Sequence, residues 1–115
     1  MNEDRLRRRE RRLRVYTLRD LRQRGLYWGL RPSLSGTPIY RLFGLPSDIR
    51  AEVHAHFCMA FFVISPYENI YSQFHRDFET GNSDTTERAV LHASRAVLAY
   101  LEVREAEVVR ALSTE

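Results

Sequence analysis

The sequence lacks most features that identify secreted and membrane-spanning proteins. Its single cysteine, Cys58, cannot form an intramolecular disulfide, and a lone thiol is typical of a reducing compartment. The longest apolar run, residues 57–64, is shorter than the roughly 18 apolar residues that a membrane span needs. Charged residues stand at the N-terminus, where a signal peptide would need an apolar core. We therefore expect an intracellular protein, cytoplasmic or nuclear (in the host cell if viral), with no membrane contact.

Lysine is absent as well, so all 18 basic residues are arginine. The formal net charge of +3 hides a strong division along the chain. Residues 1–31 hold 11 arginines and 4 acidic residues, a net charge of +7, whereas residues 32–115 hold 7 arginines and 11 acidic residues, a net charge of −4. Arginine differs from lysine in contacting phosphate bidentately and in stacking on bases. The charge pattern thus indicates a basic segment that meets a polyanion.

The basic segment, residues 1–25, is expected to be helical. At three places in residues 3–15 an acidic residue stands four positions before an arginine, a spacing that supports a helix in isolation. Only two leucines, one heptad apart, provide an apolar stripe, so this helix is predicted to be solvated or to order on contact. A capping pattern at Thr17 then predicts a second, short helix over about 18–24, which Gly25 ends.

Glycine and proline recur through residues 26–46, a segment that is still rich in leucine and aromatic residues. Such a segment cannot form a long helix, and it is too apolar for a flexible linker. We interpret it as an ordered loop on the core, with one short extended piece at residues 39–43.

Residues 47–115 are interpreted as the helical core and the region of self-association. Apolar residues at spacings of three and four predict a helix over 48–64, with Ser47 as its N-cap. Capping patterns predict two more helices, an aromatic-rich one over 66–79 and a long one over about 84–112. The last helix would measure about 39 Å, and its far end needs a cover that a second copy of the chain would supply.

These patterns predict a single all-α domain, a small bundle of about four to five helices that forms a dimer. At 115 residues the chain has room for one domain. The alternative to dimerisation is that the N-terminal helix folds back over the last helix within one chain.

The leading functional hypothesis is a non-enzymatic protein that binds nucleic acid through phosphate and shape, with double-stranded or structured RNA ahead of DNA. Phosphate contacts provide affinity through counterion release, and aromatic rings beside arginine can stack on unpaired bases. Trp28 is interpreted as a core residue in preference to a stacking platform. The candidate binding residues are Arg5, Arg7, Arg8, Arg9, Arg11, Arg12, Arg14, Arg19, Arg22, Arg24, Trp28 and Arg31.

Three sharper hypotheses are disfavoured. A helix-turn-helix beginning at Thr17 would carry its recognition helix through Pro32, at a cost of about 3 kcal/mol. His54, His56 and Cys58 cannot all face one ion on a helix, so neither a metal nor any cofactor is expected. Arg50 and His56 share a spacing found in some helical ribonucleases, but no further catalytic group accompanies them, and we expect neither an enzyme nor a small-molecule substrate.

The alternative function is a protein-interaction module, an inhibitor or regulator. It would dock an acidic partner surface through the basic segment or through the aromatic residues of 67–78. The general plan, a small arginine-rich segment before a helical body, is similar to that of viral and phage accessory proteins that bind RNA or DNA, although no motif is shared.

Overall fold

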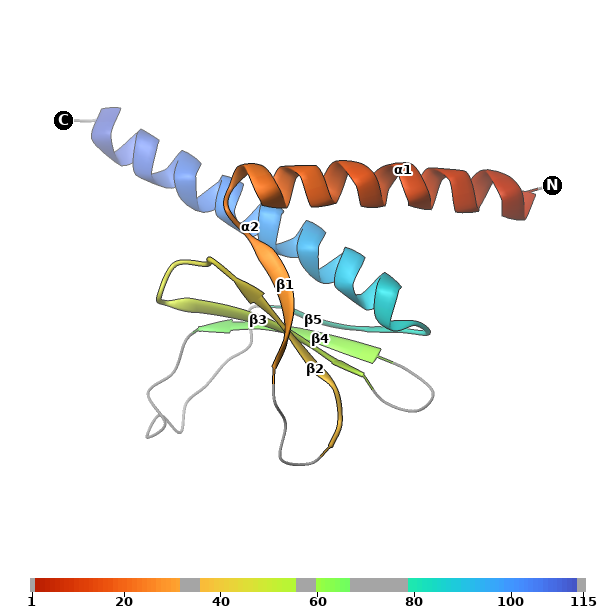
Figure 1. Ribbon diagram of the computed structural model, residues 1–115. Coiled ribbons are helices and arrows are strands. Elements are labelled where there is room, and N and C mark those ends of the chain that lie inside the picture. The colour runs from red at the N-terminus through yellow and green to blue at the C-terminus, as the bar shows by residue number, and fades with distance from the viewer. Residues whose placement is uncertain (1, 32–35, 56–59, 67–78, 114–115) are drawn as a thin grey trace.

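The protein is an α+β domain in which two helices lie on one side of an antiparallel sheet (Figure 1). The computed structural model describes residues 2–31, 36–55, 60–66 and 79–113. The elements in chain order are α1 (Asn2–Gln23), β1 (Tyr27–Arg31), β2 (Ile39–Phe43), β3 (Ile49–Ala55), β4 (Ala60–Pro66), β5 (Glu79–Ser83) and α2 (Thr86–Ser113).

The five strands form a meander, because their order in the sheet is their order in the chain. The central strand, β3, shows how the sequence specifies this sheet. Its residues Ile49, Ala51 and Val53 are buried, and they alternate with Arg50, Glu52 and His54. Such a period of two places the first set on the side of the helices and the second set on the opposite face.

Helix α2 packs against the buried face of the sheet, contacting β3, β4 and β5. Small residues allow a close approach, since Ala89 and Ala93 are fully buried together with Val97. Leu98 and Leu101 complete this side of the core. Figure 1 shows α1 lying along α2, with the C-terminal part of α2 and the N-terminal part of α1 extending in opposite directions.

Helix α1 ends in a glycine turn that fixes its position on the body. Gly25 has a φ of +73°, the Gly25 amide donates to the Arg22 carbonyl, and the Leu26 amide donates to the Leu21 carbonyl at 2.8 Å. This is the Schellman pattern of a helix C-terminus, with the associated apolar contact supplied by the buried Leu21 and Leu26. Gly44, between β2 and β3, approaches the same turn so closely that a Cβ there would lie 2.3 Å from the Gly25 carbonyl oxygen.

The prediction of an all-α bundle is wrong. The segment expected as a helix over 48–64 is the antiparallel pair β3 and β4. The helix expected over 66–79 falls almost entirely on residues 67–78, which lie outside the described residues. Apolar spacings of three and four within 48–64 also fit a strand pair, because short apolar runs do not distinguish helix from strand. The β-branched and aromatic residues of 60–64 favour strands. Within residues 26–46 the structure contains β1 and β2, and residues 47–115 contain β3, β4 and β5 as well as α2.

Other expectations are confirmed. The basic segment is helical, although the two predicted helices are the single continuous α1, and Gly25 ends it. The extended piece at 39–43 is β2, but β1 also lies in the supposed loop. The long last helix is α2. In the described part of the chain, neither helix has the length and hydropathy of a membrane span.

Candidate nucleic-acid interface

One face of α1 packs on α2. Most of the residues on this face are uncharged or acidic, and few are arginines. Thr17 and Leu21 are almost fully buried there, and Glu10 and Arg14 are half-buried. Their spacing of three and four places them in one row along the helix. The second half of α1 is therefore fixed to the body, and its other faces remain at the surface.

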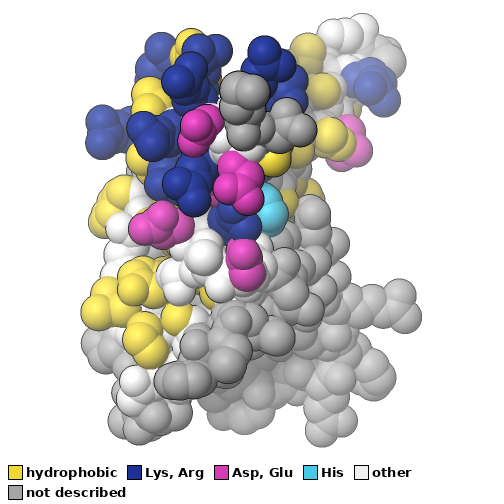
Figure 2. Space-filling view, turned by 90° about the vertical axis from the view of Figure 1, so that its right-hand side faces the viewer, with side chains coloured by type: hydrophobic (Ala, Val, Ile, Leu, Met, Phe, Trp, Pro, Cys, Tyr) yellow, Lys and Arg dark blue, Asp and Glu magenta, His cyan; other side chains and the backbone are white. Residues whose placement is uncertain are grey.

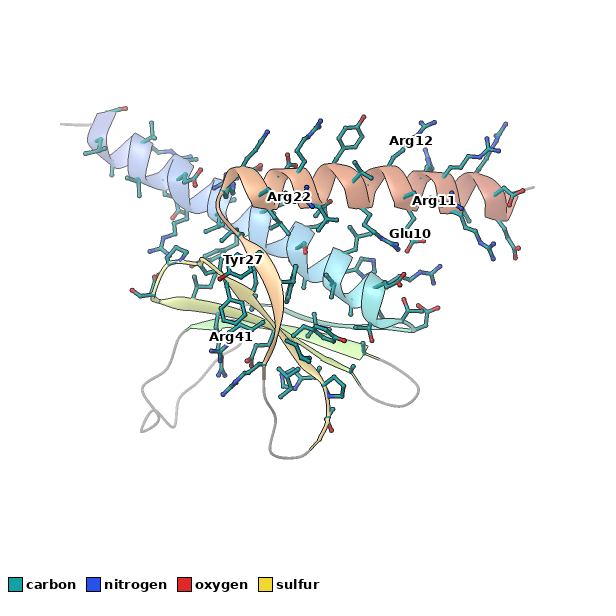
Figure 3. All side chains as sticks on the ribbon, in the orientation of Figure 1. Glu10, Arg11, Arg12, Arg22, Tyr27 and Arg41 are labelled. Carbon is teal, nitrogen blue, oxygen red and sulfur yellow. The ribbon has the colours of Figure 1, made fainter. Side chains whose placement is uncertain are left out.

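The opposite face of α1 carries an exposed row that we call the arginine stripe. Its members recur at spacings of three and four over four turns, and all are exposed: Arg5, Arg8, Arg9, Arg12, Tyr16 and Arg19. Figure 3 shows Arg12 pointing away from α2 and the sheet, while Glu10 points from the same helix toward α2. Figure 2 shows basic side chains gathered over the N-terminal part of α1.

Two of the four acidic residues of α1, Glu3 and Glu10, lie on the side away from the arginine stripe. Glu10 binds Arg88 of α2 with an N–O distance of 3.1 Å, and Glu3 falls in the same row as Glu10, seven residues earlier. In the described part of the chain the stripe arginines form no ion pair, and their charge is available to a ligand. Arg19 instead lies over the ring of Tyr16, with its guanidinium carbon 4.7 Å from the ring centre.

The structure separates the predicted arginines into two groups. Arg7, Arg11 and Arg22 are exposed. Arg7 falls in the row of Arg14, seven residues earlier, on the side of α1 toward α2, whereas Arg11 and Arg22 lie between that row and the stripe. Arg14 and Arg24 connect α1 to α2, because Arg14 lies 3.4 Å from Glu87 and Arg24 forms a two-pronged pair with Glu105. The hydrogen bond from Arg24 lowers the pKa of Glu105. These two arginines hold the helix in place, so they are less available to a ligand.

Trp28 lies on the helix side of the sheet. Its indole Nε1 donates to the Ser94 hydroxyl of α2 at 2.8 Å, and its ring packs against the buried core. This placement removes Trp28 from the candidate interface.

Arg31 belongs to a different cluster, on the sheet face that points away from both helices. The carboxylate of Glu52 is 4% exposed there and accepts hydrogen bonds from Arg31 at 2.9 Å and from Arg41 at 3.2 Å and 3.3 Å. Burial raises the pKa of Glu52, but the hydrogen bond from Arg31 and the charges of Arg41 and Arg50 outweigh it, and the pKa lies below its ordinary value. The His54 ring nitrogen Nε2 is 3.6 Å from the other carboxylate oxygen.

Sequence reasoning missed this cluster because it treated residues 48–64 as a helix. The alternation of Arg50, Glu52 and His54 with apolar residues was the available signal. The cluster neutralises the charge of Glu52. Arg31 is engaged in this structural contact, so it is less available to a ligand.

The residues of the earlier metal and ribonuclease hypotheses are not brought together within the described part of the chain. Among the described residues no three potential ligands come together, and His56 and Cys58 lie outside them. Arg50 lies in β3, so the helical spacing that connected it with His56 does not apply. The aromatic residues of 67–78 and Pro32, on which the helix-turn-helix argument depended, also lie outside the described part; the element after Gly25 is a strand, not a recognition helix.

Comparison of the chain with family models, with curated protein sequences and with solved structures finds no match.

Proposed function

We propose that the protein binds nucleic acid without acting on it chemically, and that the arginine stripe of α1 contacts the phosphates. The observation that carries this proposal is the segregation of charge on α1, with exposed arginines that form no ion pair with the described residues on one face and Glu10 engaged with α2 on the other. From Arg5 to Arg19 the stripe extends about 21 Å at 1.5 Å per residue. This length suits several successive phosphates.

Binding by phosphate and shape is favoured over reading of base edges. The side chains of the stripe are almost all guanidinium groups, which bind phosphate oxygens bidentately. With Trp28 in the core, Tyr16 is the one aromatic residue in the stripe, which disfavours stacking on single strands. Duplex or structured nucleic acid is therefore the expected ligand. RNA is ranked ahead of DNA because arginine-rich segments commonly order on RNA.

The test measures the affinity of the full chain for duplex RNA, duplex DNA and single-stranded RNA at two salt concentrations. Affinity should fall steeply with salt, because each neutralised phosphate contributes about −0.9 to the slope of log K against log salt on duplex DNA. A variant with Arg5, Arg8, Arg9 and Arg12 changed to alanine should lose most of its affinity and, if each contacts one phosphate, about 3.6 units of that slope.

A charge-changing control separates the stripe from overall charge. Arg95 and Arg110 of α2 are exposed and lie off the stripe. Changing these two to alanine should weaken binding much less than changing Arg8 and Arg12 to alanine, which removes the same charge from the stripe. Equal losses in the two variants, or no binding to any of the nucleic acids at low salt, would contradict the proposal. The second result would favour the alternative function, docking of the stripe on an acidic protein surface.

We also propose self-association through the C-terminal part of α2. Four large apolar residues are exposed there, each by more than half: Val103, Val108, Val109 and Leu112. Sedimentation of the full chain should show a dimer, and Val108→Asp together with Leu112→Asp should shift it to a monomer. A monomer in the unchanged protein would contradict this part.

A further inference from the structure

Helices α1 and α2 pack on each other over only part of their lengths. The contact begins where Glu10 pairs with Arg88, close to the start of α2. It ends where Arg24, just after α1, pairs with Glu105. Both helices continue past this contact, and they do so at opposite ends of the molecule (Figure 1).

Each helix therefore has an overhang, a segment that lies beyond the contact. The α1 overhang is residues 3–9 and the α2 overhang is residues 106–113, and every residue of both is exposed. The α2 overhang contains three large apolar residues that are each more than half exposed, Val108, Val109 and Leu112. Such a patch at the end of a helix is suited to contact with another surface.

The apolar patch of the α2 overhang continues the side of α2 that receives α1. Leu91, Glu105 and Leu112 differ by multiples of seven, so they fall in one row along the helix. Leu91 lines the same groove as Thr17 of α1, and Glu105 pairs with the residue that follows α1. Leu112 is the next member of the row, and Val108 stands one turn before it. This part of the surface is therefore suited to a helix that packs as α1 does.

The α1 overhang in turn continues the side of α1 that packs on α2. Glu3, Glu10 and Thr17 form a row with the same spacing of seven. Glu10 and Thr17 in this row lie against α2, through the pair with Arg88 and through burial respectively. Leu6 stands beside the row, between Glu3 and Glu10, and is 60% exposed. Each overhang thus presents the surface that packs against the other helix in the body of the protein.

We propose that the α2 overhang of one copy of the chain packs on the α1 overhang of a second copy, and the reverse. A single two-fold axis produces both contacts, because the two overhangs of one copy extend in opposite directions. This inference rests on the self-association proposed above, and it names the surface that the end of α2 meets. That surface is the start of α1 in the other copy, not the other α2.

The charges of the helix ends favour this closed dimer over a head-to-tail chain of copies. In the closed dimer the paired overhangs run antiparallel, so the start of α1 lies beside the end of α2. The first turn of α1 contains Glu3 and Asp4, and the last turn of α2 contains Arg110. The helix dipoles also have opposite signs at these two ends. In a head-to-tail chain the overhangs would run parallel, and the same acidic turn would lie near Glu105 and Glu107.

The two-fold axis also sets the arrangement of the two arginine stripes. Each stripe lies on the side of α1 away from α2, and each α1 overhang lies on the α2 overhang of the other copy. Both stripes therefore lie on the same face of the dimer and run antiparallel to each other. The two strands of a duplex are antiparallel as well, and protein dimers commonly match this symmetry.

Cross-linking tests the exchange of overhangs. Two full-length proteins are made in a Cys58→Ser background, one with Leu6→Cys and one with Val109→Cys, and a short bismaleimide joins thiols that lie close together. The exchange predicts a covalent dimer when the two proteins are mixed, and little product when either is treated alone. A chain that has both changes should give dimers and no larger products.

Three results would count against the inference in different ways. Cross-linking of the Val109→Cys protein to itself, without product in the mixture, would overturn the exchange and leave self-association through α2 in place. A ladder of larger products from the chain with both changes would overturn the closed dimer. A monomer in sedimentation of the unchanged protein would overturn the proposed self-association together with this inference.

A matched pair of variants gives a second measurement. Leu6→Asp should weaken the dimer about tenfold or more in sedimentation equilibrium, because a charge replaces an apolar contact. Val15→Asp makes a similar change at an exposed position on another side of α1, and it should leave the dimer unchanged. An equally stable dimer in Leu6→Asp and in the unchanged protein would overturn the exchange.

Discussion

The buried carboxylate of Glu52 offers the sharpest test of the fold, through the variant Glu52→Gln. The change keeps the size of the side chain and one acceptor oxygen, but it removes the negative charge that Arg31 and Arg41 contact. Hydrogen bonds to charged groups contribute about 1.5–3 kcal/mol each, and breaking a fully buried ion pair costs about 3–5 kcal/mol.

For Glu52→Gln the structure predicts a loss of unfolding free energy below the roughly 3–5 kcal/mol of a fully buried ion pair. The side chains of Arg31 and Arg41 are 43% and 21% exposed, so both guanidinium groups can regain water when the carboxylate is lost. We expect the free energy of unfolding to fall by about 2 kcal/mol. With an unfolding entropy of about 2.1 cal/mol/K per residue, this corresponds to a Tm lower by about 8 °C.

Thermal and urea denaturation of the full chain measure this loss. The matched control is Glu107→Gln in α2, which removes the same charge at an exposed position. It should change the free energy of unfolding by less than about 0.5 kcal/mol. A loss of that small size in Glu52→Gln would refute the reasoning, because it would mean that the carboxylate is solvated and the arginine contacts contribute little.

Three further predictions concern the same packing. Trp28→Phe should lose about 1 kcal/mol in urea denaturation, because the bond to the Ser94 hydroxyl disappears, and Tyr27→Phe, on the other sheet face, should lose little. Gly44→Ala should lower the free energy of unfolding more than Gly25→Ala in the same assay, although both glycines have positive φ. A Cβ at position 44 would meet the Gly25 carbonyl, whereas nothing lies within 4 Å of a Cβ at position 25. Acid titration followed by circular dichroism should show stability falling from about pH 4.5 downward. The pKa of Glu52 in the folded protein is lowered from its ordinary 4.5. The contribution of Glu52 to stability is therefore complete above that pH and is lost as the pH falls through the folded-state pKa.

The sequence was informative where local signals agree with the tertiary structure. Helix α1 has acid and arginine pairs and a glycine stop, and α2 has a long apolar periodicity with an acidic first turn, so both could be predicted. The sheet could not, because the spacing of Ile49, Val53 and Ala60 fits a helix and a strand pair equally well. Only the pairing with β2 and β4 decides between them, and pairing is not a local property.

The candidate site was predictable as a segment but not as a surface. Composition identified the arginines of residues 5–31, yet it could not show which of them α2 and the sheet would engage. Arg14, Arg24 and Arg31 differ from Arg5 and its neighbours in the stripe only through partners that are distant in the sequence. For Arg14 and Arg24 that distinction depends on how α1 packs along α2, and for Arg31 it depends on the pairing of the strands in the sheet.

The arginine stripe also implies a cost of self-repulsion within α1. Arg5, Arg8, Arg9 and Arg12 stand three or four positions apart, which makes four like-charge neighbour pairs on one helix face, each destabilising by about 0.2–0.5 kcal/mol at low salt. None of these four residues lies in the half of α1 that α2 holds in place. Counterions, or the phosphates of a bound strand, relieve this repulsion, so the helicity of the first three turns should itself rise on binding and serve as a spectroscopic report of it.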